Sequence, residues 1–139
     1  MIKNLLHIFI IFFLSTNLFA KSEYVKEGID LYNKNKFEEA KFKFEQDIVF
    51  NPKSELSYLY LSKIFKKLDN RNLEEQNLNT VVLLNPKNEE AIYNLAKLKL
   101  SSSDYQKSIE LNKVLKSICK NYCNQSDKLK VEIENLSKK

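Results

Sequence analysis

Cys119 and Cys123 are the only cysteines of this chain, and their type and spacing could support chemistry. The spacing is neither the C-x-x-C of redox folds nor part of a set of four metal ligands. In an oxidising compartment an even cysteine count favours a disulfide. Side chains at i and i+4 of a continuous helix seldom satisfy disulfide geometry, so we expect a helix to stop between them, at Asn121. A structural disulfide is therefore predicted, with two free thiols or a redox or metal role as alternatives.

Residues for catalysis are sparse in the rest of the chain. The only histidine, His7, lies in the N-terminal apolar segment, so the remainder lacks the commonest general base, Ser-His and Cys-His pairs, and His-ligated zinc. Gly28 is the only glycine, which argues against a glycine-rich phosphate cradle. Consecutive carboxylates such as Glu38-Glu39, Glu74-Glu75 and Glu89-Glu90 point about 100° apart on a helix and cannot share one substrate atom. We predict no enzyme activity, no cofactor and no metal.

Residues 1–20 have the layout of a secretory signal peptide. Lys3 precedes an apolar run from Ile8 to Leu14, and the small residue Ala20 follows. The polar residues 15–17 interrupt the run, which stays shorter than the roughly 20 residues of a spanning helix. We predict cleavage after Ala20 and a periplasmic or secreted location, and no cysteine lies there to take a lipid. An uncleaved N-terminal helix that tethers the protein to the membrane is the alternative.

The composition of the remaining 119 residues (139 − 20) favours one all-helical domain. One glycine and two prolines leave few turn formers for β-hairpins. The mature charge of +4 (22 basic minus 18 acidic residues) is mild and interspersed with glutamate, unlike a basic stripe for phosphates. We therefore expect no nucleic acid partner, and no membrane partner after signal cleavage.

The chain also repeats. Pro52 and Pro86 lie 34 residues apart (86 − 52), and the segment 48–55 matches the segment 82–89. A period of this length is typical of a helix-turn-helix unit that buries its apolar face only by stacking on its neighbours. Apolar residues at helical spacing, separated by polar turns, predict paired helices throughout the mature chain.

These residues resemble the tetratricopeptide repeat family, whose unit favours a small residue at position 8, Ala at 20, an aromatic at 24 and Pro at 32. Counted from Lys21, the first unit has Gly28, Ala40, Phe44 and Pro52 there. The resemblance implies a right-handed α-solenoid of three units, with a helix capping its C-terminal end. The expected segments are the units 21–54, 55–88 and 89–122 and a capping helix over 126–138, with Ser126 as its N-cap.

The later units depart from the pattern. The second keeps Ser62 and Pro86 but has Glu74 where a small residue is expected. Burying an unpaired carboxylate is costly, so we expect local splaying or a shift of that helix. The third keeps Ala96 but has Asn112 in place of the aromatic, as terminal repeats often do.

Small residues at position 8 permit close helix approach, and large ones fill the space beside them. Gly28, Ser62 and Ala96 should therefore be buried. An apolar stripe at helical spacing is usually core. The residues interpreted as core are Tyr24, Phe37, Phe44, Tyr58, Phe65, Leu78, Leu95 and Tyr105.

The resemblance places a binding groove on the concave wall, formed by the first helix of each unit. Its side chains would suit an extended or helical peptide with apolar anchors and an acidic group. The groove residues implied are Val25, Ile29, Tyr32, Asn33, Leu59, Tyr60, Lys63, Lys66, Lys67, Tyr93, Asn94, Lys97 and Leu100. The alternative is that these lysines are only the solvated face of amphipathic helices.

The family's binding mode for the C-terminal carboxylate of chaperone tails uses Lys and Asn at positions 5 and 9 of a first unit. Here those positions are Val25 and Ile29, so that partner is not predicted. We interpret the protein as a non-catalytic protein-binding module or scaffold, with self-association left open. The rivals are a membrane-tethered assembly factor and a thiol-disulfide participant using Cys119 and Cys123.

Overall fold

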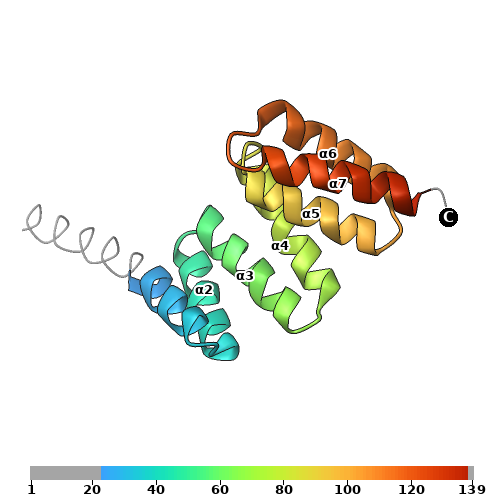
Figure 1. Cartoon of the computed structure of the whole chain (residues 1–139). Helices are drawn as coiled ribbons and strands as arrows, with labels where there is room; N and C mark the ends of the chain where they lie inside the picture. The colour runs from blue at the N-terminus through green and yellow to red at the C-terminus, as the bar shows by residue number, and fades with distance from the viewer. Residues whose placement is uncertain (1–22, 138–139) are drawn as a thin grey trace, which may run out of the picture. The chain divides into compact units, whose positions relative to one another are not determined.

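The computed structural model describes residues 23–137, and every regular element in that range is an α-helix (Figure 1). A helical segment over 23–33 precedes α2 (Phe37–Phe50), α3 (Glu55–Lys67), α4 (Arg71–Leu84), α5 (Glu89–Ser101), α6 (Tyr105–Ile118) and α7 (Cys123–Leu136). The all-helical prediction is confirmed for these residues. The chain divides into two compact units, one ending at Tyr60 and the other beginning at Leu61. The predicted signal peptide lies outside the described residues. Between residues 23 and 137, no helix is long and apolar enough to cross a membrane.

The turns inside the helix pairs repeat with the period of the sequence. Asn35, Asp69 and Ser103 have φ values of 59°, 53° and 60° and lie 34 residues apart (69 − 35 and 103 − 69). Asn and Asp tolerate this left-handed conformation better than most residues, because their short polar side chains bond to nearby backbone. The same backbone turn therefore joins the two helices of each pair.

Side-chain caps start several helices one residue after a turn. Asn70 Oδ1 accepts the Leu73 N–H at 3.2 Å at the start of α4, and Asp104 Oδ1 accepts the Lys107 N–H at 3.2 Å at the start of α6. At the start of α5, Asn88 Oδ1 accepts the Ala91 N–H at 2.8 Å. Each cap satisfies one of the N–H groups that have no partner within the helix.

The first unit packs around Gly28 and Phe44. Both are buried, and a Cβ added at Gly28 would lie 2.9 Å from two ring atoms of Phe44. The absence of a side chain is thus what allows the helical segment 23–33 to approach α2, as predicted. The core also holds Asp47, fully buried, which sequence analysis did not identify. Its Oδ2 accepts the Ser57 hydroxyl at 2.5 Å, while Oδ1 has no partner within the described residues.

The second unit is built on α5, which packs against α4, α6 and α7; in Figure 1 α5, α6 and α7 lie side by side. Ser62 and Ala96 are buried as predicted, and the Ser108 hydroxyl donates to the Ala96 carbonyl at 2.9 Å where α6 meets α5. The fully buried large side chains of this unit are Ile64, Leu78, Val81, Ile92, Leu115 and Leu129.

Of the residues interpreted as core, Phe44, Phe65, Leu78 and Leu95 are buried. The other four are half-buried: Tyr24, Phe37, Tyr58 and Tyr105.

Glu74, where the sequence led us to expect local splaying or a shift of the helix, is buried. The residue is only 5 % exposed, and α4 runs without interruption from Arg71 to Leu84. No hydrogen bond or ion pair of this carboxylate is found within residues 23–137, and its oxygens are not among the fully buried side-chain atoms without a partner. Burial raises the pKa of Glu74, although the charges of Lys66 and Arg71 act in the opposite direction. The packing around α4 therefore disfavours the ionised form of Glu74 relative to the protonated form.

The third connection between helix pairs contains the predicted disulfide. Cys119 and Cys123 are bonded at 2.06 Å, and no continuous helix contains both, as expected. The helix α6 ends at Ile118, before both cysteines, and not between them at Asn121. The next helix, α7, begins at Cys123, three residues before the predicted start (126 − 123). Ser126 is not its N-cap, because its hydroxyl donates to Asn112 Oδ1 at 2.9 Å in the interior.

Candidate functional site

The groove residues predicted in the first unit are mostly engaged in packing. Tyr32 and Tyr60 meet edge to face with ring centroids 5.2 Å apart, and Tyr60 stacks on Phe44 at 5.0 Å. Leu59 is buried, which corrects its assignment as a groove residue. The remaining members differ in exposure, with Asn33 exposed and Val25 and Ile29 half-buried.

Two of the predicted groove lysines are already paired within the second unit. Lys63 Nζ of α3 lies 2.8 Å from Glu90 Oε1 of α5. Lys97 Nζ of α5 contacts both carboxylate oxygens of Glu132 on α7 at 2.7 Å. These pairs join neighbouring helices, so an acidic ligand would have to compete with a carboxylate already in place.

Lys66 and Lys67, at the end of α3, are the exposed lysines of the predicted set, and neither forms an ion pair within residues 23–137. On α5, Tyr93 and Asn94 are half-buried, and the Tyr93 ring lies 5.6 Å from that of Tyr122. We call the surface formed by Lys66, Lys67, Tyr93 and Asn94 the α3–α5 face. It combines cationic groups, an amide and an aromatic ring.

Leu100 is buried and corrects the predicted set at its C-terminal end. The burial of Leu100 could not be predicted from the spacing of apolar residues, because α5 packs against α4, α6 and α7 and is apolar on most sides.

The loop between α6 and α7 is held by the Glu89 carboxylate, a role that sequence analysis did not identify. The two oxygens of Glu89 accept the backbone N–H groups of Lys120, Asn121 and Tyr122 at 2.9, 2.9 and 2.8 Å. Desolvation alone would raise the pKa of Glu89, but these three N–H donors and the charge of Lys120 outweigh it and lower the pKa. The carboxylate and the disulfide together position the start of α7.

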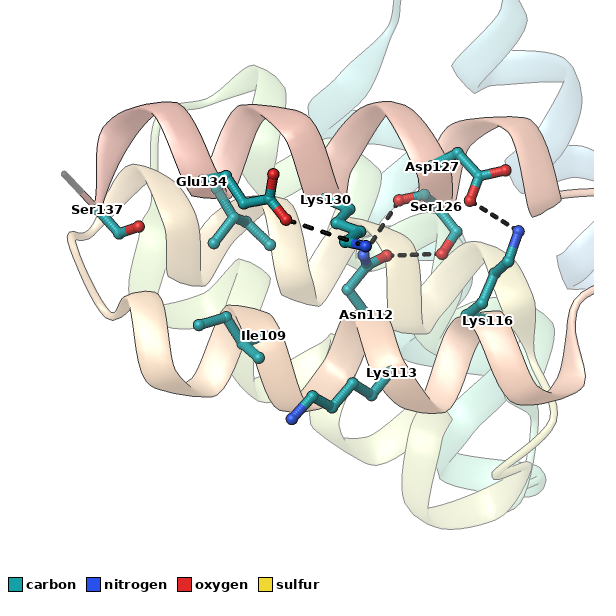
Figure 2. Close-up of a pocket in the computed structure, with 10 residues that line it drawn as sticks. Ile109, Asn112, Lys113, Lys116, Ser126, Asp127, Lys130, Glu134 and Ser137 are labelled. Carbon is teal, nitrogen blue, oxygen red and sulfur yellow. Dashed lines mark hydrogen bonds and ion pairs between the residues drawn. The ribbon is translucent and has the colours of Figure 1, made fainter.

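A groove between α6 and α7, of about 470 Å³, was not predicted from the sequence (Figure 2). We call it the terminal groove; its walls include Ile109, Lys113 and Lys116 from α6 and Lys130, Ile133 and Glu134 from α7. Between the helices, Asn112 Nδ2 donates to the Ser126 carbonyl at 3.0 Å. The 34-residue period is the signal that could have indicated this groove. Cys123 follows Glu89 by one period (123 − 89), so α7 corresponds to the first helix of a further pair, and the groove lies beside it.

Metal-ligating side chains do not converge in the described part of the chain. Between residues 23 and 137, no three His, Cys, Asp or Glu side chains form a group that could hold a metal ion.

Several solved structures have a similar fold. The Yersinia enterocolitica type III secretion chaperone SycD, in complex with a peptide of the translocator YopD, has a TM-score of 0.74 at 13% identity, covering 84% of this chain and 91% of that chain. The TPR2B domain of yeast Sti1, in a complex with pHsp70, has a TM-score of 0.77 at 15% identity, covering 84% and 98%. The Arabidopsis OM64 TPR domain has a TM-score of 0.73 at 19% identity, covering 88% and 98%.

No protein-family model and no curated protein matches the sequence. At these identities the structural likeness shows the fold, and it confirms that the chain forms a tetratricopeptide-repeat-like helical solenoid.

Proposed function

We propose, on the premise of a tetratricopeptide-repeat-like fold, that this chain is an exported, non-catalytic protein-binding module that works in the periplasm. The observation that carries the proposal is the α3–α5 face. Lys66 and Lys67 are exposed without an ion pair in the described residues, and Tyr93 and Asn94 lie half-buried on the neighbouring helix.

The Lys63–Glu90 ion pair supports placing the members of this face together, because it links α3 to α5 one turn before Lys66 and Lys67. A peptide with an acidic group would find Lys66 and Lys67 available, while an apolar residue could pack on the Tyr93 ring. Lys63 and Lys97, already paired with Glu90 and Glu132, have a structural role in this proposal.

The similar solved structures support the same class of function. SycD was solved with a peptide of YopD, and another similar structure is the first TPR of Spaghetti (RPAP3) bound to an HSP90 peptide, SRMEEVD. We extend from those proteins only the general mode, in which a helical repeat binds a peptide segment.

The test is a charge reversal at both exposed lysines. Lys66→Glu with Lys67→Glu should remove most proteins that are crosslinked to the unaltered protein in intact cells and identified by mass spectrometry. The matched control is Lys53→Glu with Lys87→Glu, because these lysines are also exposed and lie in the turns that contain Pro52 and Pro86. If both double variants capture the same proteins as the unaltered chain, the α3–α5 face is not the binding surface.

Export is tested separately. N-terminal sequencing of protein recovered from the periplasmic fraction should begin at Lys21, as cleavage after Ala20 requires. Recovery of intact protein from the membrane fraction would favour the tethered alternative.

A further inference from the structure

The helix α7 is in phase with the first helices of the preceding pairs. The helices α3, α5 and α7 begin at Glu55, Glu89 and Cys123, at intervals of 34 residues (89 − 55 and 123 − 89). In the second unit, α5 packs along a second helix, α6, and the Ser108 hydroxyl reaches the Ala96 carbonyl at 2.9 Å. Within residues 23–137, α7 has no second helix of its own. The terminal groove is the side of α7 and α6 on which such a helix would lie.

A second helix packed on α7 could not approach it as closely as α6 approaches α5. The residue of α7 one period after Ala96 is Lys130 (130 − 96 = 34), which lines the groove. A long side chain at a crossing point keeps the next helix away unless its charge is met. The groove therefore stays open, with Ile109 on one wall and Ile133 on the other.

The charges in the groove are unbalanced. Lys116 Nζ is paired with Asp127 Oδ1 at 2.7 Å, so these two charges compensate each other. Lys130 Nζ is 3.9 Å from Glu134 Oε1, at the limit of an ion pair, and both side chains are more than half exposed (70% and 54%). Lys113 has no ion pair within residues 23–137, although its charge helps to lower the pKa of Glu110 on the same helix. Figure 2 shows Lys113 on α6 and Lys130 on α7, with Lys130 joined to Glu134. The lining contains three lysines and two acidic side chains, a net charge of +1 (3 − 2).

We propose that the terminal groove docks an amphipathic helix of a partner protein, with a carboxylate directed at Lys130 and Lys113 and apolar side chains against Ile109 and Ile133. A helix is the form of ligand that fits, because the groove runs between two neighbouring helices and continues the stacking order of the chain. The partner carboxylate adds negative charge to a groove whose lining has one more lysine than acidic side chains. This site lies on different side chains from the α3–α5 face and does not depend on that proposal.

The chain contains a matched probe for this chemistry. Glu74 of α4 lies one period before Ser108 (108 − 74 = 34). Ser108 contacts Ala96, which in turn lies one period before Lys130. A helix like α4 that paired with α7 would therefore place its equivalent of Glu74 opposite Lys130. In α4, Leu78 and Val81 follow on the same face and are buried in the protein. A fluorescein-labelled peptide with the sequence of Arg71–Leu84 should therefore place an acid against Lys130 and apolar side chains beside it.

Fluorescence anisotropy of this peptide, titrated with the full-length protein, is the test. We expect saturable binding with a Kd below about 1 mM, weakened at least about tenfold by Glu74→Lys in the peptide, since like charges would then meet. Lys130→Glu in the protein should weaken binding of the original peptide and restore binding of the Glu74→Lys peptide. Lys87→Glu, at an exposed turn outside the groove, should change neither.

Four results of the binding experiment would overturn the proposal. They are the absence of saturable binding, a Lys130→Glu variant that fails to reverse the charge preference, equal weakening by Lys87→Glu, and loss of binding in the Lys66→Glu, Lys67→Glu variant. The last result would assign the peptide to the α3–α5 face. A mass of two chains in light scattering of the full-length protein, abolished by Lys130→Glu, would identify a second copy as the occupant and would also overturn it.

Discussion

Replacing Glu74 with glutamine is expected to stabilise the protein at neutral pH. The side chain is 5 % exposed and has no hydrogen bond or ion pair in the described residues. Burying a polar group without a partner costs about 1–3 kcal/mol in proteins, and an ionised group costs more. Glutamine keeps the shape of the side chain and removes the charge. The variant keeps a buried polar amide, so it relieves only the extra cost of burying a charge, and it leaves no cavity.

Two effects oppose this gain. Glu74 lies in the first turn of α4, where a negative charge is favoured by about 0.3–1 kcal/mol. The charges of Lys66 and Arg71 also favour the carboxylate, but burial outweighs them, because the net pKa of Glu74 is raised. Because the amide of glutamine stays buried as well, only the extra cost of the charge is relieved, and the expected stabilisation is at most about 1 kcal/mol at pH 7.

The pH dependence follows from the direction of that pKa shift. A carboxyl whose pKa is higher in the folded state favours folding only while it is protonated, so its contribution is lost as the pH rises through the folded pKa. Below the ordinary carboxyl range, Glu74 is neutral in both states and resembles glutamine. The advantage of Glu74→Gln should therefore be largest at neutral pH and disappear in acid.

Urea denaturation followed by circular dichroism measures this difference at each pH. The adjacent Glu75→Gln is the matched control, because Glu75 Oε1 is paired with Lys99 Nζ at 2.6 Å. That variant should lose up to about 1 kcal/mol at pH 7, as expected for a partly exposed ion pair. A Glu74→Gln variant that is less stable than the unaltered protein at pH 7, or equally favoured in acid, would refute the reasoning.

Gly28→Ala should lower the melting temperature, because overpacking against the buried ring costs about 1–3 kcal/mol and outweighs the helix propensity gain of up to about 1 kcal/mol; an increase in melting temperature contradicts this. Reducing the Cys119–Cys123 bond should cost about 2 kcal/mol, the value for a very short loop. Identical urea midpoints with and without reductant would argue against that role. Glu89→Gln should speed amide hydrogen exchange at residues 120–122, measured by NMR. It should also remove the stability that the lowered pKa of Glu89 contributes above the ordinary carboxyl range and loses as the pH falls through the folded pKa; unchanged exchange rates would contradict this role.

Much of the fold could be predicted because its determinants are local. The spacing of Pro52 and Pro86 indicated the period, and the polar residues between helices indicated the turns. The small residues predicted to allow close packing are buried, as in the contact between Gly28 and Phe44. The start of α7 was mispredicted, because Ser126 has the type of an N-cap but faces Asn112 in the interior.

The predicted site was less accessible to sequence reasoning, because it depends on contacts between distant residues. Lys63, Lys67 and Lys97 are chemically alike in the sequence, yet Lys63 is paired with Glu90 and Lys97 with Glu132, while Lys67 stays exposed. An ion pair forms only when packing brings two side chains within a few ångströms, and spacing along one helix does not report that distance.

The amino-acid sequence alone determined the helical period, the turns and the small residues at the crossings, since these depend on neighbours a few positions away. The tertiary structure decided which charges remain available and where α7 lies. Glu89 binds a loop more than 30 residues further along the chain, and Ile109 and Ile133 share one groove although they belong to different helices. Burial and charge pairing are properties of packed helices, so only the folded chain reveals them.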